Sequence, residues 1–122
     1  MNIIAIDIGN THISFGLFIE GTEKRIETAA GDDIRLITEV LHAQWDEVPM
    51  VKDAKKPTRD GRVVVSSVKP EWTQTIRKLV KENLHSNIML VGQDIKLPMT
   101  VDLDEPAKIG TDRVVAAAAA YS

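Results

Sequence analysis

Residues 3–11 read Ile-Ile-Ala-Ile-Asp-Ile-Gly-Asn-Thr, and residues 12–18 continue His-Ile-Ser-Phe-Gly-Leu-Phe. The apolar run at 3–6 predicts a buried strand, and the pair Gly9 and Asn10 predicts a tight turn because both residues tolerate a positive φ. In residues 13–18 the apolar side chains alternate imperfectly, which is typical of a strand with one better-buried face. We therefore expect the chain to begin with a β-hairpin.

The expected turn is a candidate phosphate-binding site. A turn of this kind directs backbone N–H groups and small hydroxyls outward, where they can bind phosphate oxygens. The carboxylate of Asp7 would repel a bare phosphate, but Mg²⁺ between the two removes this repulsion, since Mg²⁺ favours one or two carboxylates together with phosphate oxygens. The alternative is a plain tight turn in which Asp7 only accepts hydrogen bonds from neighbouring amides. On the hairpin alone, that alternative is the stronger interpretation.

A second motif, Gly110-Thr111-Asp112-Arg113, precedes an apolar run at residues 114–121 that predicts a helix. Asp112 suits a helix cap or a first turn, so a purely structural role stays open. Arg113 opposes the helix dipole at this place, and it therefore needs a carboxylate ligand or a partner across an interface. Its planar guanidinium suits the carboxylate of an organic acid, whereas the alternative is a surface or dimer ion pair.

Three segments carry a resemblance to a known family: Asp7–Thr11, Ser66–Pro70 and Gly110–Arg113. In order and spacing they resemble the N-terminal half of the type III pantothenate kinases, members of the actin-like, sugar-kinase-like ATPase superfamily. The resemblance implies ATP-dependent phosphorylation of pantothenate to 4'-phosphopantothenate, the first step of coenzyme A biosynthesis, by a homodimeric enzyme. It also implies a ribonuclease H-like/actin-like ATPase domain, an α/β fold whose mixed sheet has leading antiparallel strands and flanking helices.

The resemblance also implies roles for residues of the first and last motifs. Asp112 would be the general base that receives the proton of the substrate hydroxyl, and Asp7 would lie near Mg²⁺. The implied cofactors are ATP and Mg²⁺, with a monovalent cation, K⁺ or NH₄⁺, in the full-length enzyme. The first ATP-phosphate loop would consist of Asp7, Ile8, Gly9, Asn10, Thr11, His12, Ile13 and Ser14, and the pantothenate site of Gly110, Thr111, Asp112 and Arg113.

Two positions depart from the family pattern. Many members have a substrate-contacting Tyr where this chain has Leu103, and an Asn directly before the Pro where this chain has Glu105. Leu103 cannot donate the hydrogen bond of the tyrosine. Phosphoryl transfer asks a protein mainly for positioning and charge neutralisation, with an Asp commonly orienting the hydroxyl, so Asp112 is coherent with this chemistry independently of the family.

We expect residues 1–122 to be the N-terminal actin-like domain of a two-domain enzyme, or a truncated half of one, with the second domain absent from this chain. The superfamily closes ATP between two related domains, and the resemblance places the second phosphate loop, the cation site and the adenosine-binding segment in the second half. The isolated chain is therefore expected to be inactive. The alternative function is a non-catalytic regulator on the same scaffold, of the kind labelled a transcriptional accessory factor.

Composition excludes several other classes. Fifteen basic and 18 acidic residues give a net charge of −3, which favours neither nucleic acid nor an anionic membrane as a partner. Cysteine is absent, so disulfides, thiolate metal sites and a cysteine nucleophile are excluded, and three isolated histidines do not predict a zinc site. With no leader and no run of membrane-spanning length, a cytoplasmic location is expected. No Gly-x-x-x-x-Gly-Lys-Ser/Thr loop or glycine triplet opening a helix is present, so P-loop and Rossmann sites do not fit.

The rest of the chain predicts alternating helices and strands. Apolar residues at helical spacing predict a helix from residue 34 and another from Pro70 to Leu84, with Asp32 and Asp33 as caps of the first. Residues 49–61 are expected to form a polar loop. Further strands are expected at residues 24–29, 62–68, 87–91 and 99–103.

Overall fold

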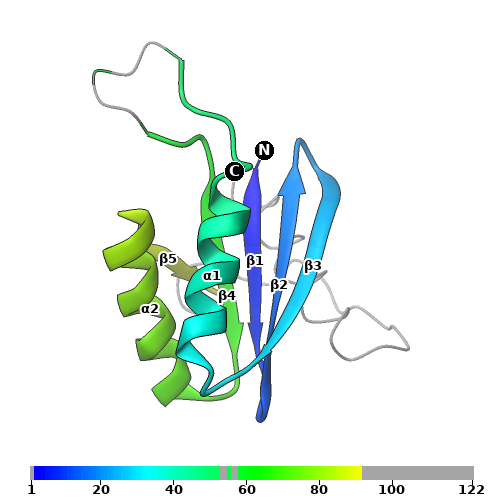
Figure 1. Ribbon diagram of the computed structural model, residues 1–122, viewed down its shortest axis with the longest axis vertical. Helices are drawn as coiled ribbons and strands as arrows, with labels where there is room; N and C mark the ends of the chain where they lie inside the picture. Colours follow the sequence, from blue (N-terminus) through cyan, green and yellow to red (C-terminus); the bar gives the residue numbers. More distant parts are fainter. Residues whose placement is uncertain (1, 53–54, 56–57, 92–122) are drawn as a thin grey trace.

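In the described part of the chain, a mixed five-stranded sheet carries two helices on one face (Figure 1). The computed structural model describes residues 2–52, 55 and 58–91. The strand order across the sheet is β3-β2-β1-β4-β5. The elements are β1 (Ile3–Ile8), β2 (His12–Ile19), β3 (Thr22–Ala30), α1 (Ile34–Trp45), β4 (Arg62–Ser67), α2 (Pro70–Leu84) and β5 (Ile88–Leu90).

Strand β1 lies where the antiparallel and parallel halves of the sheet meet. It pairs antiparallel with β2 and parallel with β4. On the outer sides, β2 pairs antiparallel with β3, and β4 pairs parallel with β5. Short turns join the antiparallel strands, whereas the connections between parallel strands pass through helices, as parallel pairing requires. The predicted α/β class, with leading antiparallel strands and flanking helices, is confirmed, and the strand order agrees with a ribonuclease H-like/actin-like domain.

Alternation along β1 assigns its side chains to two faces. Ile4, Ile6 and Ile8 lie in the core under α1 and α2, whereas Ile3 and Ala5 belong to a smaller cluster on the opposite face. Full burial of one such aliphatic side chain stabilises the fold by about 1.5–3 kcal/mol. The two helices supply their buried apolar positions at three- and four-residue spacing, Ile37, Val40 and Leu41 from α1 and Ile76, Val80 and Leu84 from α2.

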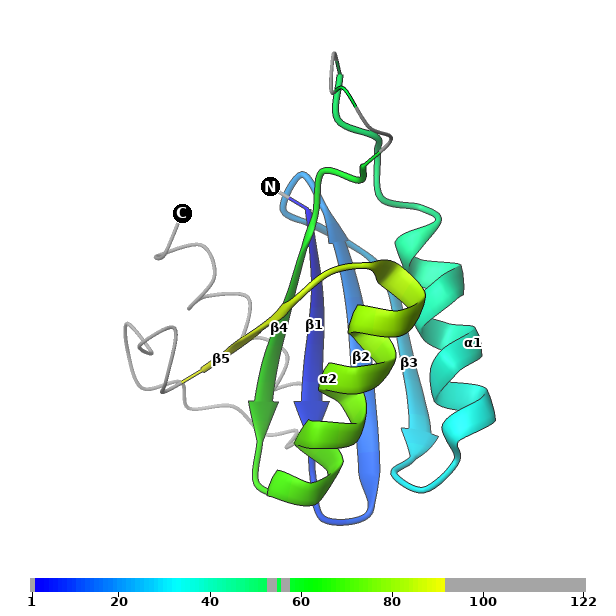
Figure 2. The same cartoon turned by 90° about the vertical axis from the view of Figure 1, so that its left-hand side faces the viewer.

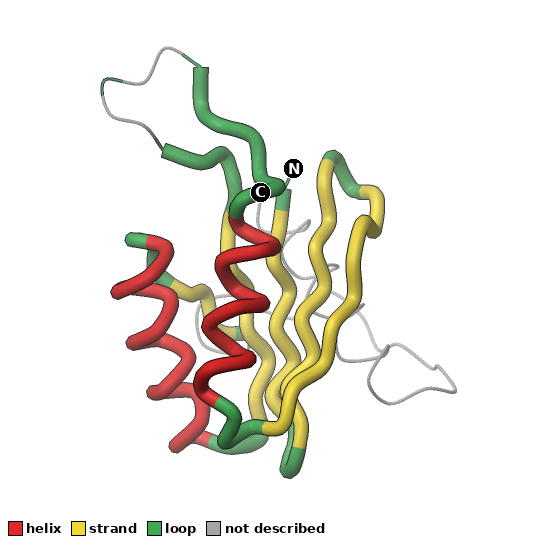
Figure 3. Tube along the Cα trace, in the orientation of Figure 1, coloured by secondary structure: helices red, strands yellow, loops and turns green. Residues whose placement is uncertain are grey.

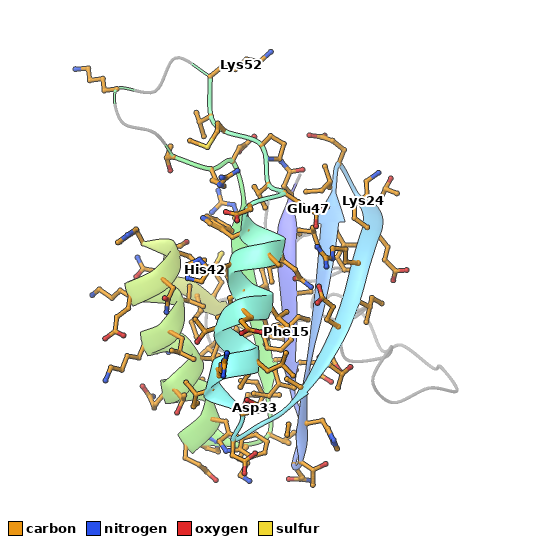
Figure 4. The ribbon with its side chains drawn as sticks, viewed as in Figure 1. Phe15, Lys24, Asp33, His42, Glu47 and Lys52 are labelled. Carbon is orange, nitrogen blue, oxygen red and sulfur yellow. The ribbon has the colours of Figure 1, made fainter. Side chains whose placement is uncertain are left out.

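Both helices begin where the sequence predicts. Asp33, labelled in Figure 4, directly precedes α1. Its Oδ1 accepts a hydrogen bond from the amide of Leu36 at 3.2 Å. Pro70 is the first residue of α2, a position where its missing N–H is not needed. His85 ends α2 in the left-handed region with φ of 52°.

Three connections meet at one edge of the sheet: the β1–β2 turn, the β3–α1 connection and the β4–α2 connection (Figures 1 and 3). Backbone hydrogen bonds join them, because Gly31 N donates to Thr11 O and Val68 N donates to Ile8 O, each at 3.1 Å. Figure 2 shows these three connections together at the lower end of the sheet, and the long loop between α1 and β4 at the opposite end. This edge carries the candidate site.

In the predicted polar loop at 49–61, the described residues 49–52, 55 and 58–61 contain no helix or extended strand, and an isolated bridge joins Met50 and Arg59. Neither helix in the described part of the chain combines the length and apolar character needed to cross a membrane. The strand predicted at 99–103 and the helix predicted at 114–121 lie outside the described residues.

Candidate functional site

The β1–β2 turn is tight because the amide of Gly9 donates to the carbonyl oxygen of His12 at 3.0 Å. A Cβ atom on Gly9 would lie 3.3 Å from that same oxygen, closer than an ordinary van der Waals contact. The close approach of the His12 carbonyl oxygen to Gly9 therefore favours glycine at this position. The turn is confirmed, but its expected conformational reason is wrong, because positive φ among the described residues occurs at Glu20, Gly21 and His85.

The exposed part of this turn offers hydrogen-bond donors. Asn10 and Thr11 are exposed, and their amides form no hydrogen bond with another described residue. The hydroxyl oxygen of Thr11 lies 2.9 Å from Nδ1 of the exposed His12. N–H and hydroxyl donors on such a turn can bind phosphate oxygens. Ile8 and Ile13, by contrast, bury their side chains in the core under the helices, so they can offer only backbone groups.

Asp7 lies between two serines on the sheet face opposite the helices. The strand register places Asp7 directly beside Ser14 of β2 and beside Ser66 of β4. Neighbours of this kind point to the same face, with Cβ atoms about 5 Å apart. Ser14 is 5% exposed, and Asp7 and Ser66 are half-buried. A carboxylate flanked by two hydroxyls thus lies near the end of three adjacent strands, close to the turn.

This group of oxygen ligands fits a hydrated Mg²⁺ ion. Within residues 2–52, 55 and 58–91, no three His, Cys, Asp or Glu side chains gather as a metal-binding cluster. Mg²⁺ does not require one, since it keeps several waters and takes one or two carboxylates together with phosphate oxygens. Asp7 can supply the carboxylate, and the two serine hydroxyls can hydrogen-bond to waters or phosphate oxygens.

The start of α2 is fastened beside the turn. Ser67 Oγ accepts a hydrogen bond from the amide of Lys69 at 3.0 Å, and Thr73 Oγ1 donates to the same oxygen at 2.6 Å. The ammonium of Lys69 donates to the carbonyl oxygen of Asn10 at 3.2 Å. The β4–α2 connection is therefore joined to the candidate phosphate loop by a side chain as well as by backbone.

The opposite edge of the sheet carries a separate ion-pair group. Arg25 of β3 lies 2.8 Å from Glu47, just beyond α1, and 3.1 Å from Glu27. The hydrogen bond to Glu47, and then the charge of Glu27, raise the pKa of Arg25. Figure 4 shows Glu47 and Lys24 near the end of the sheet remote from the β1–β2 turn. These charges fasten β3 to the end of α1 and lie away from the candidate site.

The structure brings together one of the two predicted groups of site residues. The segment from Asp7 to Ser14 forms the hairpin, with Asp7, the turn and Ser14 at one edge of the sheet. The other predicted group, Gly110 to Arg113, lies outside the described residues, as do Leu103 and Glu105. Sequence reasoning assigned no role to Ser66. Its place beside Asp7 follows from the parallel pairing of β4 with β1, which a single sequence does not reveal.

Comparison with known proteins identifies the family. The family model for type III pantothenate kinases matches residues 3–122. The chain belongs to the type III pantothenate kinase family. A type III pantothenate kinase from Rhodospirillum centenum is 34% identical over 121 residues, and one from Myxococcus xanthus is 31% identical over 126 residues.

The chain spans less than half the length of these relatives: each alignment covers 98% of this chain and 46% of the type III pantothenate kinase that it matches. Among solved structures, an exopolyphosphatase from Cytophaga hutchinsonii aligns with a TM-score of 0.38 at 10% identity, over 75% of this chain and 34% of its own. So low a score supports no conclusion about this chain.

Proposed function

We propose that this chain is the N-terminal domain of a kinase that transfers the γ-phosphoryl group of ATP to the primary hydroxyl of pantothenate, giving 4'-phosphopantothenate. The single observation that supports the site is the position of Asp7, between Ser14 and Ser66 and close to the exposed donors of the β1–β2 turn. Membership of the type III pantothenate kinase family supports the substrate.

The roles that we assign to the turn and to Asp7 follow from the negative charge of the ATP phosphates. The amides of Asn10 and Thr11 bind phosphate oxygens of ATP, and Asp7 holds Mg²⁺ directly or through water. When bound, Mg²⁺ neutralises phosphate charge that Asp7 alone would repel. Phosphoryl transfer depends mainly on such positioning and charge neutralisation.

The acceptor side of the reaction is assigned to the second motif. Asp112 accepts the proton of the pantothenate hydroxyl as that oxygen attacks the γ-phosphorus, and the bond from the γ-phosphorus to the β,γ-bridging oxygen breaks so that ADP leaves. Gly110, Thr111 and Arg113 hold the substrate, with the guanidinium suited to its carboxylate. The resemblance on which this assignment rests also leads us to propose a K⁺ or NH₄⁺ requirement, a homodimer and a cytoplasmic location for the complete enzyme.

Product formation by the complete protein that contains this chain tests the proposal. The protein is incubated with pantothenate and MgATP, and 4'-phosphopantothenate is measured by mass spectrometry. Asp7→Asn is expected to lower kcat/KM by about a hundredfold or more, because one charge-stabilising group is removed from the phosphates. Asp32→Asn is the matched control, since Asp32 is an exposed acid at the same edge whose side chain forms no hydrogen bond with another described residue.

The outcomes separate the alternatives. The proposal is supported if Asp7→Asn loses phosphopantothenate formation, Asp32→Asn retains it, and both variants melt close to the wild-type temperature. A strongly destabilised Asp7→Asn variant with unchanged activity per folded molecule would show that Asp7 only stabilises the turn. No product with any monovalent cation would contradict the kinase and favour a non-catalytic regulator.

A further inference from the structure

Lys69 links two of the connections that meet at the candidate site. It is the last residue before α2, and its ammonium nitrogen lies 3.2 Å from the carbonyl oxygen of Asn10 in the β1–β2 turn. The same nitrogen lies 3.7 Å from the centre of the Trp72 ring. A carbonyl oxygen and the face of an indole both attract a cation. One side chain therefore fastens the turn to the start of the helix.

Hydrogen bonds hold the backbone of Lys69 at the start of α2, so its side chain begins beside the β1–β2 turn. Its amide donates to Ser67 Oγ at 3.0 Å, and its carbonyl oxygen accepts hydrogen bonds from the amides of Trp72 and Thr73, each at 3.1 Å. Within residues 2–52, 55 and 58–91, no other lysine or arginine forms a hydrogen bond with residues 9–11.

A lysine at this place has an energetic cost. A cation at the N-terminus of a helix opposes the helix dipole, and holding a long side chain in one conformation loses rotamer entropy. A short neutral residue would avoid both losses. The contact with Asn10 supplies a reason for the lysine, because a neutral apolar side chain could not orient that peptide.

The planarity of the peptide determines what this contact does. The carbonyl of Asn10 and the amide of Thr11 belong to one planar trans peptide group, in which C=O and N–H point in opposite directions. When Lys69 holds the oxygen, it therefore also fixes the direction of the Thr11 N–H, which points away from the lysine. A charged donor on the carbonyl also polarises the peptide and strengthens the N–H as a donor.

We propose that Lys69 is a positioning residue for the nucleotide phosphates: by holding the Asn10 carbonyl, it directs the amide of Thr11 at a phosphate oxygen. The inference rests on the proposed function, since it takes the β1–β2 turn as the phosphate loop. Lys69 acts through the peptide group, so its removal weakens phosphate binding without removing a direct contact.

The test measures binding of MgADP and of adenosine to the complete protein by calorimetry. Lys69→Met keeps the length of the side chain and removes its charge, and we expect the Kd for MgADP to rise about tenfold, the value of one charge-assisted hydrogen bond. Adenosine has no phosphate, so its Kd should not change. Lys69→Arg should restore MgADP binding to within about threefold of wild type, because a guanidinium can also donate to the carbonyl and stack on the indole.

Lys78→Met is the matched control, because Lys78 is an exposed lysine of α2 and its loss changes the net charge equally. Its MgADP affinity should match wild type. Equal MgADP binding by Lys69→Met and wild type would overturn the inference and leave the proposed function standing. Equal weakening of MgADP and adenosine would also overturn it, since that result indicates general structural damage. Failure of the wild-type protein to bind MgADP would contradict the proposed function, and this inference with it.

Discussion

Gly31 and Trp72 are packed so closely that a methyl group on Gly31 should destabilise the domain. A Cβ atom built on Gly31 would overlap the six-membered ring of Trp72 at Cε3, Cζ3 and Cη2. The φ of Gly31 lies outside the left-handed region, so alanine meets no backbone penalty there. The predicted effect of Gly31→Ala therefore comes from the ring alone.

The expected magnitude has two parts of opposite sign. Overpacking of this kind costs about 1–3 kcal/mol. Replacing Gly by Ala at a compatible position lowers the entropy of the unfolded chain and stabilises by about 0.4–1 kcal/mol. Gly31→Ala should thus lower the free energy of unfolding by about 0–2.6 kcal/mol, with a central value of about 1.3 kcal/mol. In a Trp72→Leu background the overlap disappears, and the same substitution should become stabilising by about 0.5 kcal/mol.

Urea unfolding of the 122-residue chain, followed by far-UV circular dichroism at one protein concentration, measures the four members of this double-mutant cycle. Gly21→Ala is the control, because Gly21 has a φ of 78° and no atom within 4 Å of its added Cβ. It should cost about 1 kcal/mol in both backgrounds, through backbone strain. If Gly31→Ala has the same effect in the wild-type chain and in the Trp72→Leu background, the packing argument is refuted.

Three further predictions concern the proposed base Asp112, the buried side chain of Gln44, and the association and activity of the 122-residue chain. Asp112→Asn in the complete protein should lower kcat about 10²–10⁴-fold with the Kd for ATP retained, and a wild-type kcat would remove Asp112 as the base. Gln44 is fully buried and donates to the carbonyl oxygen of Phe15 at 3.1 Å, so Gln44→Glu should destabilise by about 3 kcal/mol at pH 7. Burial raises the pKa of the new carboxyl above its unfolded value, so the loss should shrink as the pH falls towards about 4, and a pH-independent loss would contradict this reasoning. The 122-residue chain alone should self-associate in light scattering and give no turnover in a coupled kinase assay; a monodisperse, active monomer would contradict both expectations.

Local signals predicted most of the fold. The apolar run of β1, the acid that caps α1 and the proline that opens α2 each act within a few residues, and the structure confirms the elements they predict. The turn at residues 9–11 was also predicted, although glycine is favoured there by the nearby His12 carbonyl and not by positive φ. Two explanations for glycine give the same sequence pattern, so the sequence could not separate them.

Contacts between distant segments were not predictable in the same way. Lys69 reaches Asn10 across 59 positions of the sequence, and Ser66 lies beside Asp7 only because β4 pairs with β1 in one particular register. Three successive valines in β4 show no alternation, so they do not indicate which face Ser66 occupies. Asp7 became a candidate because it follows a buried strand and precedes a glycine turn, both of which are local features. Those features alone favoured a plain turn, and the resemblance to the kinase family supplied the prediction of a site role.

A crystal structure of the complete protein with MgADP would show whether the β1–β2 turn binds the nucleotide phosphates. We expect a phosphate oxygen about 2.7–3.2 Å from the amide nitrogen of Asn10 or Thr11, and Asp7 bound to Mg²⁺ directly or through one water. Phosphates bound elsewhere, with the β1–β2 turn and Asp7 contacting neither phosphate nor metal, would contradict it.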